Sequence, residues 1–204
     1  FYFQEIAAAH ATDLGIGYDD LIKDDRIWVL SKVKYKLNGK ISLNNRYIIE
    51  TYPRGKKGVI YLRDYYIKDE TGKVIAAGES HWCVINFKTR RVERADLQFG
   101  DDFIETEAIP EGIERIKLKA PVKVGAHVVQ REDLDVNEHT NNCRYADMIG
   151  EITGRDDYRE FNIHFVKESR LGDAIDIYRE DSEQGELFTG RLSDGSVIFQ
   201  AKVI

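Results

Sequence analysis

The chain of 204 residues contains the same succession of sequence patterns twice. In each case the pattern of an amphipathic helix is followed by several segments with the apolar–polar alternation of strands. In each half, a stripe of apolar side chains recurs at helical spacing, and glycine follows it. The stripes are formed by Phe3, Ile6, Ala7, His10 and Leu14 before Gly15, and by Tyr145, Met148, Ile149 and Ile152 before Gly154. Because such a stripe must be buried against a second layer, each half is predicted to be a helix with an antiparallel sheet.

Alternation of apolar and polar side chains predicts the strands. Residues 27–37 set the pattern, with apolar side chains on one face and Lys32, Lys34 and Lys36 on the other. Turn signals lie at 53–58 and 70–72. The further strands are expected at 46–52, 59–67 and 74–87 in the first half, and at 122–129, 160–168, 174–179, 187–192 and 197–204 in the second.

Residues 89–121 separate the two halves, because they carry many charges, two of the three prolines and little periodicity. The sequence therefore predicts an α+β protein with domains at 1–95 and 121–204, joined by a linker at 96–120. The second half has a strand ahead of its helix, whereas the first half opens on the helix. If the halves are structural repeats, the first strand of the N-terminal domain is missing from this sequence.

Composition excludes several classes of protein. Hydrophobic residues make up 42% and charged residues 32%, which is typical of a folded globular chain. No apolar run approaches the roughly 20 residues of a membrane helix, and the net charge of -6 disfavours nucleic acid as a partner. Cys83 and Cys143 lie far apart, which argues against a disulfide framework and suits a reducing compartment. Neither a metal nor a cofactor is expected, because no ligand spacing is present.

The stretch DLDVNEHTNN, residues 133–142, is the most polar motif of the second half. Asp135, Asn137 and His139 are spaced by two, so in an extended chain their side chains would project to one side. Thr140 or Asn141 is expected to cap the following helix, which leaves its first N–H groups facing the same place. Such a helix end carries roughly +0.5 charge and favours an oxyanion. These groups are the parts that hydrolysis of an acyl ester or thioester requires.

Other interpretations of this stretch remain open on spacing alone. An Asx-rich turn can cap a helix without any catalytic role. A metal site would need a second cluster with ligand spacing. A cysteine nucleophile is conceivable, because Cys143 lies one helical turn after His139. However, Cys143, Ala146 and Gly150 form a small-residue face, which favours close packing over an exposed thiolate.

The segment DLDVNEHTNNCRY resembles the D-x-N-x-H-x-N-N-x-x-Y signature of the acyl-acyl-carrier-protein (acyl-ACP) thioesterases, a family of bacteria and plant plastids. Further segments resemble the same family in the same order along nearly the whole chain. These segments are HATDLGIG, WVLSKVKYKL, RDYYIKDETGKVIAAGESHWCVINFKTRR and FNIHFVKESRLGD. The resemblance implies two tandem hot-dog domains, each a long helix wrapped by an antiparallel sheet, with the acyl-chain pocket in the first and catalysis in the second.

The resemblance also implies the site residues. By position, the catalytic set is Asp135, Asn137, His139 and Glu168, the last from the segment VKES, with Asn141, Asn142 and Ser169 as possible supporting residues. In our hypothesis Asn137 and helix N–H groups receive the thioester oxygen, while Asp135, His139 and Glu168 activate water. The division of work among these three is open, because Asp135 could attack the thioester to form an anhydride or could serve as the base. Some plant members carry a cysteine beside this glutamate. The serine found here disfavours a cysteine acyl-enzyme.

The expected substrate is an acyl chain linked through phosphopantetheine to an acyl carrier protein, whose acidic surface would dock on a basic cluster at 54–57, 90–94 or 117–123. His10, Trp28 and Trp82 are candidates for the acyl pocket. A bacterial cytoplasmic protein, monomeric or homodimeric, without nucleic-acid or membrane partners, is expected. The alternatives are an acyl-CoA thioesterase and a non-catalytic hot-dog module that binds acyl thioesters.

Overall fold

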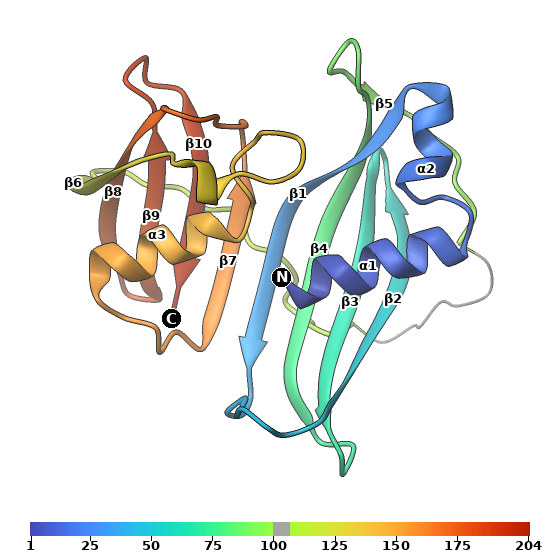
Figure 1. The fold of residues 1–204 in the computed structure, drawn as a ribbon. Helices are drawn as coiled ribbons and strands as arrows, with labels where there is room; N and C mark the ends of the chain where they lie inside the picture. The colour runs from blue at the N-terminus through green and yellow to red at the C-terminus, as the bar shows by residue number, and fades with distance from the viewer. Residues whose placement is uncertain (100–106) are drawn as a thin grey trace. The chain divides into compact units, whose positions relative to one another are not determined.

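The computed structural model describes residues 1–99 and 107–204. They divide into two compact units, Phe1–Ile113 and Glu114–Ile204, which are called unit 1 and unit 2 below (Figure 1). Each unit contains a helix and an antiparallel sheet, so the predicted α+β class is confirmed. Among the described helices, none has the length and apolar character needed to cross a bilayer.

Unit 1 begins with its helix. The elements are α1 (Tyr2–Asp13), α2 (Tyr18–Leu21), a 3-10 turn at Ile22–Asp24, β1 (Arg26–Leu37), β2 (Tyr47–Lys57), β3 (Ile60–Asp69), β4 (Val74–Asn86) and β5 (Val92–Glu93). The strands follow the order β2-β3-β4-β1, and β5 pairs with β4. Helix α1 lies across this sheet (Figure 1). The Phe3 ring stacks on Tyr65 with centroids 4.5 Å apart, and Gly78 permits this approach because a Cβ there would lie 2.3 Å from the Phe3 ring.

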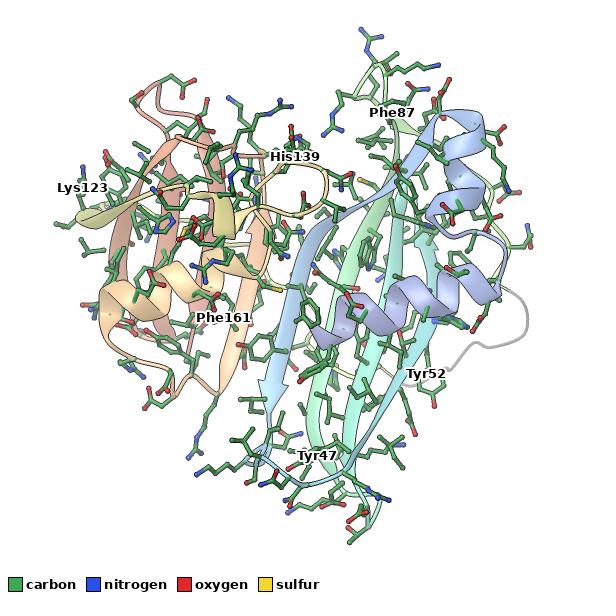
Figure 2. The ribbon with its side chains drawn as sticks, viewed as in Figure 1. Tyr47, Tyr52, Phe87, Lys123, His139 and Phe161 are labelled. Carbon is green, nitrogen blue, oxygen red and sulfur yellow. The ribbon has the colours of Figure 1, made fainter. Side chains whose placement is uncertain are left out.

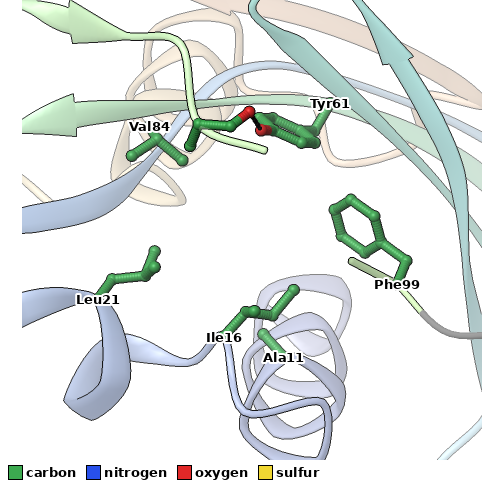
Figure 3. Packing of buried hydrophobic residues seen from close by; sticks show 7 residues of the cluster. Ala11, Ile16, Leu21, Tyr61, Val84 and Phe99 are labelled. Atoms are coloured by element: carbon green, nitrogen blue, oxygen red, sulfur yellow. Dashed lines mark hydrogen bonds between the residues drawn. The ribbon is translucent and has the colours of Figure 1, made fainter. Parts of the chain in front are cut away.

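The helix-facing side of the unit 1 sheet carries an apolar core. The Tyr61 ring is tilted against Phe99, and the Tyr61 hydroxyl donates to the Ala95 carbonyl (Figure 3). The buried members of this core are Ala11, Ile16, Leu21, Tyr61, Val84, Ala95 and Phe99. Chain segments far apart in sequence are therefore joined mainly by removing apolar surface from water.

The opposite side of this sheet is charged and buried. Successive side chains of a strand alternate, so Asp64, between Arg63 and Tyr65 on β3, faces away from α1. The Arg54 Nε lies 3.1 Å from Asp64 Oδ1, and its Nη2 lies 3.2 Å from Glu79 Oε2. The Nε atom is not aligned as a hydrogen-bond donor, so that contact is an ion pair held by charge. Because Arg54, Asp64 and Glu79 are almost fully buried, their charges depend on one another.

Residues 107–112 cover this charged face. Glu107 pairs with Arg54 Nη1 at 2.8 Å, and the Ala108 N–H donates to Asp64 Oδ2 at 2.8 Å. The fully buried Lys34 donates to Glu111 Oε1 at 3.1 Å. Burial raises the pKa of Asp64 to about 6, against the lowering effects of the Ala108 N–H and Arg54.

Unit 2 has a strand before its helix. Its elements are β6 (Val122–Val128), a 3-10 turn at Arg131–Asp133, α3 (Arg144–Thr153), β7 (Glu160–Phe165), β8 (Ala174–Ser182), β9 (Gly185–Arg191) and β10 (Val197–Val203). The strand order is β7-β10-β9-β8-β6. The stripe predicted for the helix is its buried face, where the Tyr145 ring lies 5.1 Å from Phe199 and 6.0 Å from Phe165. Gly125 on β6 leaves room for the Ile152 side chain, because a Cβ atom at this position would lie 2.9 Å from Ile152 Cδ1.

Several predicted boundaries are wrong. The strand expected at 174–179 continues to Ser182. The turn expected at 53–58 belongs mostly to β2, which continues to Lys57 through an irregular register between Pro53 and Lys56. Gly55, with a φ of 85°, allows this irregularity, and β2 lies at the edge of the unit's sheet, where proline is tolerated. The strand expected at 160–168 ends at Phe165, because the N–H groups of Val166 and Lys167 turn toward the Ile198 carbonyl. The extents of the two domains and of the linker stay predictions.

The buried charges of unit 1 generate a test of stability. Replacing Arg54 with Met leaves Asp64 and Glu79 without their cation, so the free energy of unfolding should fall by about 3–5 kcal/mol near neutral pH. The folded-state pKa of Asp64 lies above its ordinary value, so the folded chain takes up this proton at higher pH than the unfolded chain. The loss in the free energy of unfolding should therefore become smaller as the pH is lowered from about 7 to about 5. Urea unfolding measures it. Lys57→Met, at an exposed position of β2, is the control, and equal losses in both variants would contradict a stabilising role for the Arg54 charge.

Candidate active site

The motif in unit 2 forms a tight turn between the 3-10 turn and α3. Asp135 Oδ1 accepts the N–H of Asn137 at 2.8 Å and the N–H of His139 at 3.2 Å. The Asp135 N–H donates to the His139 carbonyl at 2.8 Å, and Glu138 adopts a φ of 60°. The extended conformation predicted for 135–139 is therefore wrong, because the aspartate side chain replaces strand pairing with an Asx turn. Asn137 is exposed to solvent in this turn.

His139 and Glu168 meet across this site. The Nε2 atom of His139 lies 3.2 Å from Glu168 Oε2, although 29 residues separate the two in the sequence. His139 also forms a single antiparallel bridge with Arg170. The His139 side chain is 18% exposed and that of Glu168 is 40% exposed, so both are accessible to solvent. Figure 2 labels His139 on the ribbon of unit 2. An imidazole beside a carboxylate is the arrangement of a base and the group that orients it.

A hydroxyl network lies directly behind this pair. Thr140 follows His139, and Ser169 follows Glu168. The Thr140 N–H donates to the Ser169 carbonyl at 2.9 Å, and the two hydroxyls lie 2.6 Å apart. The Tyr145 hydroxyl from α3 lies 3.0 Å from Ser169 Oγ, and burial raises the pKa of Tyr145. Ser169 is completely buried and bonded on both sides, so its position is structural in this geometry.

Asp133 fixes the position of the turn through hydrogen bonds of its carboxylate and its carbonyl. Its Oδ2 receives the Gln130 N–H at 2.8 Å and lies 2.7 Å from His127 Nε2, while its Oδ1 lies 2.7 Å from Arg144 Nε. The Asp133 carbonyl accepts the Asn141 N–H at 2.8 Å. Burial by itself would raise the pKa of this carboxyl, but these donors outweigh burial and lower the pKa to about 2.

Sequence reasoning missed the roles of Asp133, His127 and Arg144. One signal was available, because Asp133 opens the same polar stretch and Arg144 follows it. The contribution of His127 comes from β6 and could not be read from spacing. His127 and Arg144 hold the Asp133 carboxylate, and the Asp133 carbonyl accepts the Asn141 N–H, so the three together position the turn at the start of α3.

The start of α3 differs from the predicted cap. The N-cap residue is Cys143, without a side-chain cap, and Thr140 bonds Ser169 instead. Asn141 accepts the Cys143 N–H at 3.0 Å, one step before the helix, and Asn142 lies half-buried beside it. Among the residues that the structure describes, Cys143 forms no disulfide bond. Over residues 1–99 and 107–204, no group of three His, Cys, Asp or Glu side chains is arranged to hold a metal.

A cavity of about 250 Å³ lies in unit 1, between α1 and the sheet. Trp28 and Trp82 both line it, and their indole N–H groups bond the Ile16 carbonyl at 2.8 Å and Ser80 Oγ at 2.6 Å. Tyr61 and Phe99 complete an aromatic wall, and alanines of α1 form the opposite side. His10 is placed differently, because it borders a separate shallow hollow and bonds Arg63 through Nδ1.

Two helix-and-sheet units of this kind, one with a hollow apolar core and one with a carboxylate–imidazole pair, define a tandem hot-dog protein. The family described as "Acyl-ACP thioesterase N-terminal domain" matches residues 1–106, and "Acyl-ACP thioesterase C-terminal domain" matches residues 117–203. The chain belongs to the acyl-ACP thioesterase family, and the resemblance found in the sequence is confirmed.

Similar proteins agree with this assignment. An acyl-ACP thioesterase structure from Bacteroides thetaiotaomicron is 26% identical, with a TM-score of 0.91 over 100% of this chain and 86% of that chain. The 12:0-ACP thioesterase from Umbellularia californica shares the fold, at 19% identity and a TM-score of 0.85 over 99% of this chain and 86% of its own. The chloroplastic palmitoyl-acyl carrier protein thioesterase of Cuphea hookeriana is 28% identical over 170 residues, 74% of this chain. The chain spans about 40% of that relative's length.

Asp133 generates a test of the turn. Asp133→Asn should lower the free energy of unfolding by about 3 kcal/mol at neutral pH, because a buried partner of His127 and Arg144 is lost. Since the folded pKa is depressed, the stabilisation is present above about pH 4 and is lost as the pH falls toward 2. The gap between wild type and variant should close over that range in denaturant titrations. Asp147→Asn removes an exposed partner of Arg144 and should cost under about 1 kcal/mol. A difference in stability that persists at pH 2 would show that the Asp133 charge does not stabilise the turn.

Proposed function

We propose that this protein hydrolyses the thioester of a fatty acyl chain on acyl carrier protein and releases free fatty acid. The observation that carries this proposal is the distance of 3.2 Å between His139 Nε2 and Glu168 Oε2. Membership of the thioesterase family supports the substrate class, and the C-terminal family match spans both residues. Relatives are named as hydrolases of acyl carrier protein thioesters, which supports the same reaction.

In the proposed mechanism His139 is the base. It takes a proton from water as the water oxygen attacks the thioester carbon, while Glu168 holds the imidazole and stabilises its charge. The exposed Asn137 amide and N–H groups at the start of α3 stabilise the oxyanion. When the tetrahedral intermediate collapses, the C–S bond breaks and the imidazolium protonates the thiolate. Asp135 contributes by holding the turn through its Oδ1, which accepts two N–H groups.

We further propose that unit 1 holds the acyl chain and unit 2 performs the chemistry. The cavity lined by Trp28, Trp82, Tyr61 and Phe99 supports the first assignment, because it is the apolar space that such a chain requires. Chain length, oligomeric state and location in a bacterial cytoplasm stay predictions.

Substitutions at the pair test the mechanism. His139→Ala and Glu168→Gln should each lower kcat at least about a hundredfold, since a positioned base contributes about 10²–10⁴ in rate. Glu138→Gln changes an exposed carboxylate next to His139 and should leave kcat near wild type. Release of free thiol from acyl-ACP measures all three, with circular dichroism as the check on folding. Wild-type turnover in both site variants would refute the assignment.

The substrate panel separates the alternatives. Acyl-ACP and acyl-CoA of equal chain length should differ in kcat/KM, with the carrier-protein thioester preferred. Equal or better hydrolysis of acyl-CoA would favour an acyl-CoA thioesterase. Binding without hydrolysis of either would favour a non-catalytic module.

Of the basic clusters, we propose 90–94 as the docking surface for the acidic carrier. Arg54 is unavailable because it is buried, Lys56 pairs with Asp96, and Lys123 pairs with Asp176. Arg91 and Arg94 are exposed beside β5.

Charge reversal tests this surface. Arg91→Glu with Arg94→Glu should raise KM for acyl-ACP by about fivefold or more and change kcat little, because exposed charges act mainly on association. The effect should weaken as salt is added. Lys40→Glu makes a similar change at an exposed position of the loop before β2 and is the control. An unchanged KM in the double variant would count against docking at this cluster.

A further inference from the structure

Arg63 is a buried cation in the wall of the unit 1 cavity. It lies on β3 between Tyr61 and Tyr65, on the side of the sheet that faces α1. The residue is 6% exposed, and it lines the cavity together with Trp28 and Trp82. A guanidinium is unusual there, because most of the other lining groups are aromatic rings and aliphatic side chains.

The contacts of Arg63 are with neutral groups. Its Nη1 lies 2.9 Å from His10 Nδ1 and 3.1 Å from Thr51 Oγ1. To accept from Arg63 through Nδ1, His10 must be neutral with its proton on Nε2. Among the residues that the structure describes, no carboxylate is paired with this guanidinium.

Arg54 is an example of a buried arginine with a structural role. Arg54, on the neighbouring strand β2, is surrounded by Asp64, Glu79 and Glu107. Arg63 is buried to a similar degree, and none of the acids in residues 1–99 and 107–204 is paired with it. Burial lowers the pKa of Arg63, because the charged guanidinium has lost water of hydration.

An unbranched hydrocarbon chain would leave this charge unsatisfied. Filling the cavity with methylene groups would remove its remaining water and offer no acceptor, which is costly for a guanidinium. Apolar pockets commonly contain a few placed polar groups that select a matching group on the ligand. The guanidinium has five N–H donors, and the contacts with His10 and Thr51 use only those of Nη1. An oxygen atom on the ligand could accept from the others.

We propose that the cavity takes an acyl chain that carries an oxygen acceptor, as a hydroxyl, oxo or carboxylate group, and that Arg63 binds this oxygen. The inference rests on the proposed function only in taking the ligand to be an acyl chain. It adds a specificity residue in unit 1 and assigns the substrate class as oxygenated rather than plain fatty acyl groups.

Binding can be measured apart from hydrolysis. Trp28 and Trp82 are the only two tryptophans of the chain and both line the cavity, so their fluorescence reports on its occupancy. The probes are three methyl esters of equal chain length: decanoate, ω-hydroxydecanoate and the monomethyl ester of decanedioate. In wild type the hydroxy and carboxy probes should each bind at least about tenfold more tightly than the plain ester, as expected for a hydrogen bond to a charged group. Equal affinity for all three would overturn the proposal, and this comparison needs no variant.

Two variants locate the preference. Arg63→Met keeps a side chain of similar length without charge and should bind all three probes with similar affinity, while Arg63→Lys should keep a preference for the carboxy probe. If Arg63 served only to hold α1 through His10, Arg63→Met would lower the melting temperature and retain the wild-type preference. That result would refute the assignment.

Turnover separates this inference from the proposed function. Hydroxyacyl and plain acyl thioesters of one length should differ in kcat/KM in wild type and become similar in Arg63→Met. Equal kcat/KM in wild type contradicts the inference alone. A binding preference without hydrolysis of any thioester supports the inference and contradicts the proposed reaction.

Discussion

The hydrogen bonds between Thr140 and Ser169 are the constraint on which the site in unit 2 depends. Each of these residues adjoins one member of the His139–Glu168 pair, and both are buried. A backbone bond and a hydroxyl bond join them, and Tyr145 adds α3 to the same network. The ionisable groups face accessible space, while the atoms that fix their separation are held in the core. Fixed groups of this kind lose little entropy when a substrate arrives, which favours catalysis by preorganisation.

Three of the buried charged side chains that the structure describes have different surroundings. Asp133 is surrounded by donors and holds a turn. Arg54 is surrounded by acids and holds residues 107–112 on the outer face of the unit 1 sheet. Arg63 contacts His10 and Thr51, and no acid among the described residues is paired with it. Because a buried ion is stable only with good partners, the fold explains the first two charges, and the third is the one for which we propose a ligand.

Periodicity predicted the helices and strands because both units bury one face of each element. It failed at 135–139, where the Asp135 side chain accepts backbone N–H groups and forms a turn. It also failed at 53–58, where Gly55 allows β2 to continue. The pairing of His139 with Glu168 came only from family resemblance, because spacing carries no information about contacts between distant segments. The roles of His127 and of residues 107–112 were missed for the same reason. Arg63 gives no signal in the sequence, since a polar residue among tyrosines on a strand looks like an ordinary exposed position.

Some positions of the turn that carries the motif need a particular side chain to form its hydrogen bonds, and others do not. Val136 is 98% exposed and Glu138 is exposed with a positive φ, so neither side chain is needed for the hydrogen bonds that shape the turn. Those bonds use the Asp135 carboxylate and main-chain groups, and the latter are supplied by any residue except proline. In the signature D-x-N-x-H, these are the two unspecified positions within the turn. Evolution can therefore change the outer surface of the turn, and with it whatever the turn touches, while the inner geometry is inherited unaltered.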